Sequence, residues 1–311
     1  MITRRQFLKG IAAGSAAFAI GRFWNTEASA EESPQPDVRL LLEENDADCV
    51  AILGARGSMP VSGKDFLRYG GSTLCVLARL DGEYIILDAG TGMAHLPQQA
   101  LESPKLTLLL SHPHADHLLG LPMCPYLMQK NACLEICAEN HAGLDTEAQI
   151  RALFSPPLWP VDPSMMAAKC SFRDLEKPFR INSVLVEFMQ GVHPGGVSIF
   201  RLTGSRKTIV FATDNTLTEE KREELLNFAQ GCDLLMIDGQ YSDAEWSGRE
   251  TWGHSRWKDA ARFGHECGAK AVRILHHDPT HTDELLDEAG RQVKALFENC
   301  SFAGEGETIR L

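Results

Sequence analysis

The chain of 311 residues lacks several patterns that would place it in a class at once. Its nine cysteines include no Cys-x-x-Cys pair, which argues against a zinc site built on thiolates. The body of the chain has no basic run and the formal net charge is -12, so a long nucleic acid would be repelled. No internal repeat is present. A small anionic substrate is compatible with this charge, because bound metal ions can reverse the local field.

The first thirty residues differ in kind from the rest. Thr3–Lys9 carries two adjacent arginines followed by Phe and Leu, and leads into an apolar stretch at Ile11–Gly21 that is too short to span a bilayer. Ala28–Ala30 offers a cleavage site of small residues. The segment resembles a twin-arginine export signal, which implies the twin-arginine export machinery as a partner and a periplasmic location. The alternative is an amphipathic N-terminus that remains attached.

The remaining chain is predicted to form an acidic linker at residues 31–47 and one domain at residues 48–311. Strands are expected at Cys49–Leu53, Leu74–Leu80, Tyr84–Asp88, Leu106–Ser111, Val184–Phe188, Val197–Leu202, Thr208–Ala212, Leu234–Ile237, Lys270–Leu275 and Thr308–Leu311. Helices are expected at Leu118–Gln129, Thr218–Ala229, Ser255–Cys267 and Glu284–Phe297. Phe154–Pro178 is rich in Pro and Met and predicts a long loop or lid. Strand meanders followed by strands that alternate with helices predict an α/β (α+β) fold, a four-layer αββα sandwich.

The most informative motif is His112-Pro-His114-Ala-Asp116-His117, directly after an expected strand. Two imidazoles spaced i, i+2 at a strand end point the same way, and the Asp and His that follow can turn to a second point nearby. The spacing therefore predicts ligands for two adjacent cations, with His112 and His114 on one and Asp116 and His117 on the other. Core packing does not explain four such residues, because buried imidazoles each need a polar partner.

This motif resembles the signature of hydrolases with the metallo-β-lactamase fold, and further family motifs follow in order. The resemblance implies that His193, in Gln190–Gly196, is the third ligand of the first metal. It implies that Asp214, at the end of an expected strand, is the carboxylate that bridges both metals. In Ile274–Pro279 it implies His276 as the last ligand, and His277 is the alternative.

Two further motifs are similar to those of the tRNA-maturing endonucleases and cyclic phosphodiesterases within that family. Asp238 matches a carboxylate that orients a catalytic histidine, and His254 matches that histidine. The opening stretch is also similar to that branch, at Leu53–Pro60, Tyr69–Thr73 and Leu87–Gly92. The long basic arm of the tRNA-maturing enzymes is not matched, since Phe154–Pro178 is short and has only three basic residues.

The resemblance implies a hydrolase that cleaves a small phosphodiester, either linear or cyclic, through a hydroxide held between two divalent metal ions. Nitrogen-rich ligands favour Zn²⁺, with Mn²⁺ or Fe as alternatives. The alternative activity is hydrolysis of a lactone, thioester or β-lactam on the same fold. The chain is expected to act alone or as a homodimer. Asp88 is either an ordinary turn carboxylate or a group that orients a metal ligand, and no role is assigned to His95, His141, His265 or His281.

Overall fold

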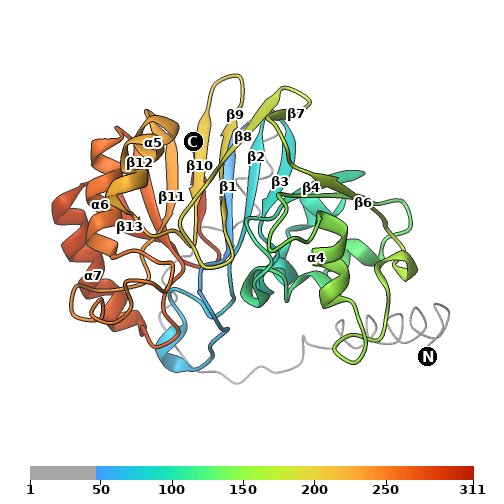
Figure 1. The fold of residues 1–311 in the computed structure, drawn as a ribbon, viewed down its shortest axis with the longest axis horizontal. Coiled ribbons are helices and arrows are strands. Elements are labelled where there is room, and N and C mark those ends of the chain that lie inside the picture. Colours follow the sequence, from blue (N-terminus) through green and yellow to red (C-terminus); the bar gives the residue numbers. More distant parts are fainter. Residues whose placement is uncertain (1–46) are drawn as a thin grey trace, which may run out of the picture.

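Two seven-stranded sheets lie face to face in the computed structural model, which describes residues 47–311 (Figure 1). The first sheet contains, in spatial order, β14 (Thr308–Arg310), β1 (Cys49–Gly54), β2 (Cys75–Leu80), β3 (Glu83–Leu87), β4 (Lys105–Leu109), β5 (Cys133–Ala138) and β6 (Lys169–Asp174). The second contains β13 (Cys300–Phe302), β12 (Ala271–Leu275), β11 (Leu234–Asp238), β10 (Thr208–Ala212), β9 (Ser198–Thr203), β8 (Val184–Gln190) and β7 (Phe179–Ile181). The predicted signal peptide and the linker up to residue 46 lie outside the described residues.

Helices cover the outer face of each sheet, so the chain has the four-layer αββα order that the sequence predicts. Outside the first sheet lie α3 (Gln98–Leu101) and α4 (Thr146–Leu153), and outside the second lie α5 (Glu219–Ala229), α6 (Trp257–Glu266) and α7 (Asp283–Leu296) (Figure 1). Each sheet is mixed: β3 to β6 run parallel, as do β10 to β13, and the other neighbours are antiparallel. Within residues 47–311 no helix is long and apolar enough to cross a bilayer.

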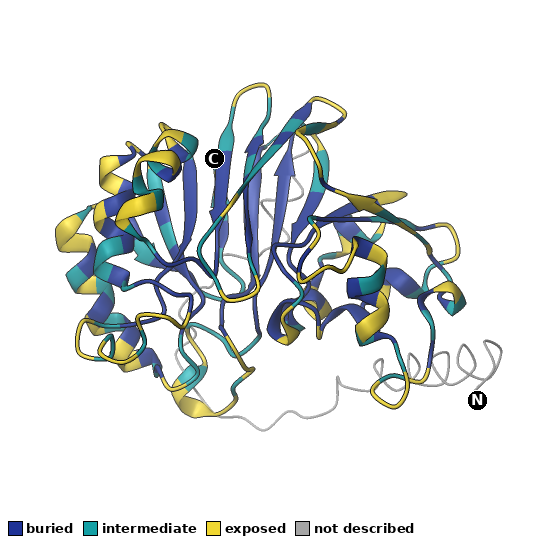
Figure 2. Cartoon of the chain, in the orientation of Figure 1, coloured by how far each residue is buried: buried dark blue, intermediate teal, exposed yellow. Residues whose placement is uncertain are grey.

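The central strands β1, β2 and β11 are buried on both faces, and Figure 2 shows this burial at the centre of the molecule. In β1, Val50 and Ile52 pack between the two sheets, whereas Ala51 and Leu53 pack outward under the helical layer. This alternation follows from the two-residue period of a strand. Each fully buried Val, Leu or Ile stabilises the fold by about 1.5–3 kcal/mol. The two sheets thus form a rigid support for the loops at their ends.

One predicted helix is wrong. Leu118–Gln129 has helical spacing of apolar residues, but the chain there forms separate 3-10 turns at Leu121–Met123 and Pro125–Met128. Pro122 and Pro125 explain the difference, because proline has no backbone N–H and its ring clashes with the preceding helical turn. The apolar side chains still pack in the core, although the backbone does not form a continuous helix.

The predicted loop or lid at Phe154–Pro178 is also wrong in part. Its second half contains β6, which pairs in parallel with β5, with Cys133 opposite Lys169. Met166 is buried, and Phe154 packs in the same outer core. The strand escapes prediction because it is a polar edge strand of which no residue is fully buried. This segment therefore belongs to the first sheet and its packing.

Candidate metal centre

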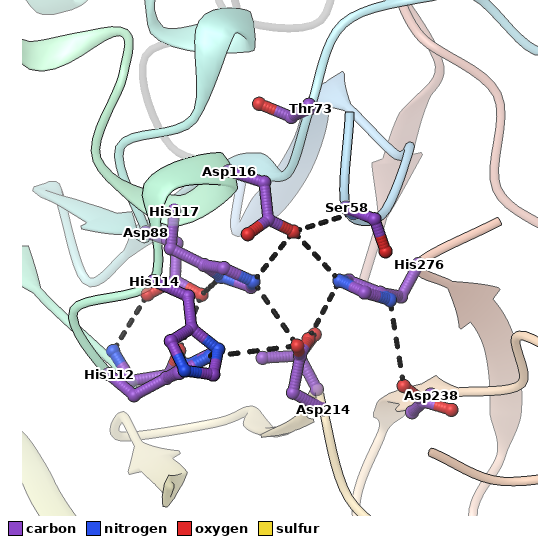
Figure 3. A network of polar contacts seen from close by, with 12 residues as sticks. Ser58, Thr73, Asp88, His112, His114, Asp116, His117, Asp214, Asp238 and His276 are labelled. Atoms are coloured by element: carbon purple, nitrogen blue, oxygen red, sulfur yellow. Dashed lines mark hydrogen bonds and ion pairs between the residues drawn. The ribbon is translucent and has the colours of Figure 1, made fainter. Parts of the chain in front are cut away.

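The side chains singled out from the sequence meet at one edge of the two sheets, where strands from both sheets end (Figure 3). His112 lies beyond the end of β4, Asp214 beyond β10 and His276 beyond β12, while Asp238 is the last residue of β11. His193 lies in the loop between β8 and β9. Because the carboxyl ends of neighbouring strands meet at one edge, residues more than 150 positions apart become neighbours.

His112, His114 and His193 form the first group. His112 Nε2 lies 2.8 Å from His114 Nδ1, and His193 Nε2 lies 3.1 Å from the same atom. The Nδ1–H groups of His112 and His193 are directed away from the group, toward Ser111 Oγ at 3.0 Å and the carbonyl of Gly253 at 3.0 Å. Both imidazoles therefore present the Nε2 lone pair to the centre of the group.

The second group contains Asp116, His117, Asp214 and His276, all of them buried. His276 Nε2 lies 3.1 Å from Asp116 Oδ2 and 3.1 Å from Asp214 Oδ1. His117 Nε2 lies 3.3 Å from Asp214 Oδ2, the oxygen that also lies 3.7 Å from His112 Nε2. Asp214 thus stands between the two groups, which is the position required of a bridging carboxylate.

The loops around the second group hold its members in fixed directions. Asp88 Oδ2 accepts a 2.7 Å hydrogen bond from His117 Nδ1, and its other oxygen accepts one from the backbone N–H of Ser111. Asp88 therefore orients a candidate ligand, which decides between the two roles that the sequence left open. Ser58, which the sequence did not single out, donates its backbone N–H to Asp116 Oδ2 at 2.7 Å.

Several of these residues adopt backbone conformations that are rare for side chains larger than glycine. Asp88, Asp214 and His276 have φ values of 59°, 48° and 64°. Such positive φ values cost free energy and occur mainly where function requires them. Gly57 packs directly on the ring of His276, where an added Cβ would lie 2.2 Å from Nδ1. Close approach to this ring is thus the reason for a glycine here.

Burial and the neighbouring carboxylates shift the pKa values of the histidines in opposite directions. Burial, with a contribution from His117, holds the pKa of His112 well below its usual value, so this imidazole is neutral. Burial would also lower the pKa of His117, but the carboxylates of Asp214 and Asp116 outweigh it and raise this pKa well above its usual value. Burial also lowers the pKa of His276, but the carboxylates of Asp214 and Asp116 outweigh this effect and raise the pKa to about 8. Without a cation, protons must therefore balance the buried carboxylates.

The donor set fits two divalent cations. His117 Nδ1–H is used by Asp88, so in the neutral imidazole the Nε2 lone pair faces carboxylate oxygens, and this buried atom has no hydrogen-bond partner within residues 47–311. In the first group three ring nitrogens converge, and the lone pairs of His112 Nε2 and His193 Nε2 both face His114 Nδ1, which can carry only one proton. A cation in each group would satisfy these lone pairs, because imidazole nitrogen and carboxylate oxygen are both ordinary metal ligands.

The structure places His276, and not His277, at this centre. His277 Nε2 instead donates to the carbonyl of Ala303 at 2.7 Å, and its ring packs against Tyr69 and Phe302. Burial lowers the pKa of His277 to about 3, so it is a neutral core histidine. His141 and His281 are also buried, His281 with Glu245 as its partner at 2.9 Å.

His254 and Asp238 lie beside the second group and form a pair. His254 Nδ1 lies 2.8 Å from Asp238 Oδ2, and the other oxygen of Asp238 accepts the backbone N–H of Ser255 at 2.7 Å. The His254 ring stacks on His276 with centroids 4.8 Å apart and lies edge-on to His193 at 5.3 Å. The pair is thus in contact with both candidate metal groups.

Asn215 was missed by the sequence reasoning. Its Oδ1 accepts the backbone N–H of Val192 at 2.7 Å, and the backbone N–H of Thr216 donates to the Val192 carbonyl. Asn215 therefore holds the loop that carries His193 next to the loop that carries Asp214. Its position directly after Asp214 was the available signal.

The comparisons with known proteins agree with the family resemblance seen in the sequence motifs. Residues 83–277 match the family described as the beta-lactamase superfamily domain. A ribonuclease Z from Nitrosopumilus maritimus is 20% identical over 269 residues, which cover 72% of this chain and 89% of that protein. The metallo-β-lactamase fold protein YhfI from Bacillus subtilis superposes with a TM-score of 0.65 at 18% identity, covering 86% of this chain and all of YhfI. A diphosphatase from the PhnP family superposes with a TM-score of 0.60 at 18% identity, covering 85% and 98%.

Proposed function

The chain belongs to the β-lactamase superfamily and has the metallo-β-lactamase fold, and from that premise we propose that it hydrolyses a small phosphodiester with two bound divalent cations, preferably Zn²⁺. The observation that carries the proposal is the His254–Asp238 pair beside the candidate metal groups. Hydrolysis of a carbonyl compound does not require such a histidine–carboxylate pair as a general acid. Departure of an alkoxide from phosphorus is accelerated by a general acid that protonates it.

The residues of the chain divide the work in the proposed reaction. His112, His114 and His193 would hold one cation, Asp116, His117 and His276 the other, and Asp214 both. The cations, when bound, supply Lewis acidity toward the phosphoryl oxygens and bring the pKa of a water molecule toward neutral.

His254 stands outside these ligand sets. With Nδ1–H held by Asp238, a protonated His254 can donate its second N–H to the leaving oxygen, and the buried carboxylate fixes the orientation of the ring.

The rest of the molecule supports a small substrate. Residues 154–178, where the tRNA-maturing enzymes have a basic arm, pack onto the first sheet. Of the three basic side chains in this segment, Arg173 is bound to Glu135 through two hydrogen bonds. The chain carries a net charge of -12, which opposes binding of a long polyanion.

The proposed function is tested by a panel of substrates. Zinc-loaded protein is assayed with bis-(p-nitrophenyl) phosphate, p-nitrophenyl phosphate, a lactone and nitrocefin, and the Asp214→Ala variant serves as the control for activity from another source. We expect the phosphodiester to be the preferred substrate. Hydrolysis of the lactone or of nitrocefin without phosphodiester turnover would move the protein to the carbonyl hydrolases.

A further inference from the structure

Residues 241–253, which we call the aromatic loop, lie between β11 and α6 beside the His254–Asp238 pair. We propose that this loop binds an aromatic group of the substrate, so that the site takes phosphate esters of nucleoside type in preference to purely aliphatic ones. This proposal rests on the proposed function, because it names the class of phosphate ester that the same site accepts.

The base of the aromatic loop is closed by backbone hydrogen bonds. Tyr241 N–H donates to the Ser255 carbonyl at 3.1 Å, and Trp257 N–H donates to the Tyr241 carbonyl at 3.0 Å. Asp238 precedes this closure and His254 lies inside it, so both ends of the loop are tied to the catalytic pair. The loop therefore has a fixed position relative to the leaving-group side of the site.

Within the aromatic loop, Arg249 lies against the rings of Tyr241 and Trp252. The Tyr241 ring is buried and lies edge-on to His254, with centroids 5.8 Å apart. The Arg249 guanidinium lies over the Tyr241 ring at 5.3 Å and over the Trp252 ring at 5.5 Å. Arg249 Nη1 also donates to the Glu245 carbonyl. Cation–π contacts and this hydrogen bond together fix the guanidinium beside the site.

The positive charge of Arg249 has no carboxylate partner within residues 47–311. This contrasts with Arg256 in the same region, which is paired with Asp259 at 2.6 Å and with Asp243 at 3.4 Å. In a chain of net charge -12, an arginine without an ion pair next to a phosphate-cleaving site provides local attraction for an anion. Arg249 thus favours the phosphate ester without contacting the candidate metal ligands.

Trp252 presents the surface on which an aromatic group can stack. The residue is 55% exposed although it lies only two positions before His254. The next residue, Gly253, is held in place because its carbonyl accepts the hydrogen bond from His193 Nδ1. Gly253 has a φ of 92°, and a Cβ there would lie 2.1 Å from that same nitrogen. The residue that carries the exposed indole is therefore followed directly by a backbone position that is hydrogen-bonded to a candidate metal ligand.

These observations describe a subsite with an open aromatic face and a cation behind it. A nucleobase matches that surface, since every base has a π-face, and stacking on an aromatic side chain strengthens binding without a specific sequence. An aliphatic sugar phosphate would use the charge of Arg249 but would gain nothing from the Trp252 ring. The difference in affinity between two such ligands therefore measures the subsite.

The test compares two ligands that share the sugar phosphate and differ at C1′, which carries a base in one and a hydroxyl group in the other. Binding of AMP and of ribose 5-phosphate to the zinc-loaded full chain is measured by isothermal titration calorimetry. We expect AMP to bind about tenfold or more tightly than ribose 5-phosphate, as base stacking predicts. Trp252→Leu should abolish this ratio, and Arg249→Gln should weaken binding of both ligands. Trp246→Leu is the matched control, because this ring also lies 6.4 Å from the Tyr241 ring but carries Arg256 on its face in place of Arg249, and its loss should leave the ratio unchanged.

Equal affinity of the wild type for both ligands, or an unchanged ratio in Trp252→Leu, would overturn the subsite. Loss of the ratio in Trp246→Leu as well would show a general disturbance of the loop and would equally overturn it. Failure of the proposed function looks different, because a clear preference for AMP without any phosphodiester turnover would remove the activity and leave the subsite in place. Thermal unfolding of each variant checks that it is folded.

Discussion

The Nδ1 atom of His117 lies 2.7 Å from Asp88 Oδ2, and neither side chain is exposed. The hydrogen bond directs the other ring nitrogen at the candidate metal groups. Asp88→Asn keeps the size of the side chain and removes its charge, so the ring should be held less firmly and in a less basic state. We expect metal affinity, measured by competition with a chromophoric chelator, to fall by about 10–100-fold.

The matched control for this variant is Asp48→Asn. Asp48 is also buried and accepts a backbone hydrogen bond, from Asp81 N–H at 2.9 Å, but it lies at the start of β1, away from the strand-end site. Its replacement should leave the affinity for metal near that of the wild type. Equal affinities of both variants and the wild type would show that Asp88 does not orient a ligand.

Asp214 should be needed for a full pair of metal ions. Its two oxygens face both candidate groups, so Asp214→Ala removes a ligand from each cation. We expect elemental analysis to give one metal ion or none per chain. Asp162→Ala, which removes a half-exposed carboxylate that pairs with Arg151, serves as the control and should retain the wild-type content. A full pair in Asp214→Ala would exclude Asp214 from the site.

The two adjacent histidines should differ in what their loss affects. His276→Gln should lower the metal content, because His276 Nε2 faces Asp116 and Asp214. His277→Gln should leave the metal content intact and instead lower the free energy of unfolding by about 1–3 kcal/mol, since it disturbs a buried hydrogen bond to Ala303. Metal analysis and denaturant unfolding of both variants make the comparison. The reverse pattern would make His277 the ligand.

The sequence alone groups the first four candidate ligands because they lie in one motif of six residues, His112–His117, directly after an expected strand. His112 and His117 share one local motif, so their spacing alone brings them together. His193, Asp214 and His276 come from separate strands, and only the resemblance to a family placed them in one site. Their meeting depends on strand order across a sheet, which local patterns do not determine.

Other features were out of reach for physical reasons. The role of Asp88 depends on a turn with positive φ that aims its carboxylate at a residue 29 positions away. The prediction of a helix at Leu118–Gln129 was wrong because the apolar spacing was given more weight than Pro122 and Pro125. The polar edge strand β6 was not predicted because its residues are too exposed to show a hydrophobic period.

Export by the twin-arginine route stays a prediction, as does the periplasmic location. Changing Arg4 and Arg5 to Lys retains the charge of the segment, yet it should trap the precursor in the cytoplasm if the route for folded proteins is used. Cell fractionation with an antibody against the chain measures this. Mature protein in the periplasm at the wild-type level would point to another route.

The central claim is that His254 acts on the leaving group of a phosphodiester while the metal ligands remain intact. Asp238 holds its ring, and His254 belongs to neither of the two ligand sets proposed above. We expect His254→Ala to keep the metal content of the wild type and to lower turnover of bis-(p-nitrophenyl) phosphate by about 10²–10⁴-fold. A cyclic nucleotide, whose leaving alkoxide needs a proton more than nitrophenolate does, should show the larger loss.

The decisive measurement is therefore kcat for wild type and His254→Ala on these two substrates, with the metal content of each preparation determined in parallel. The account predicts a loss on both substrates that is greater for the cyclic nucleotide, at equal metal content. Equal kcat values for wild type and variant on both substrates would contradict it.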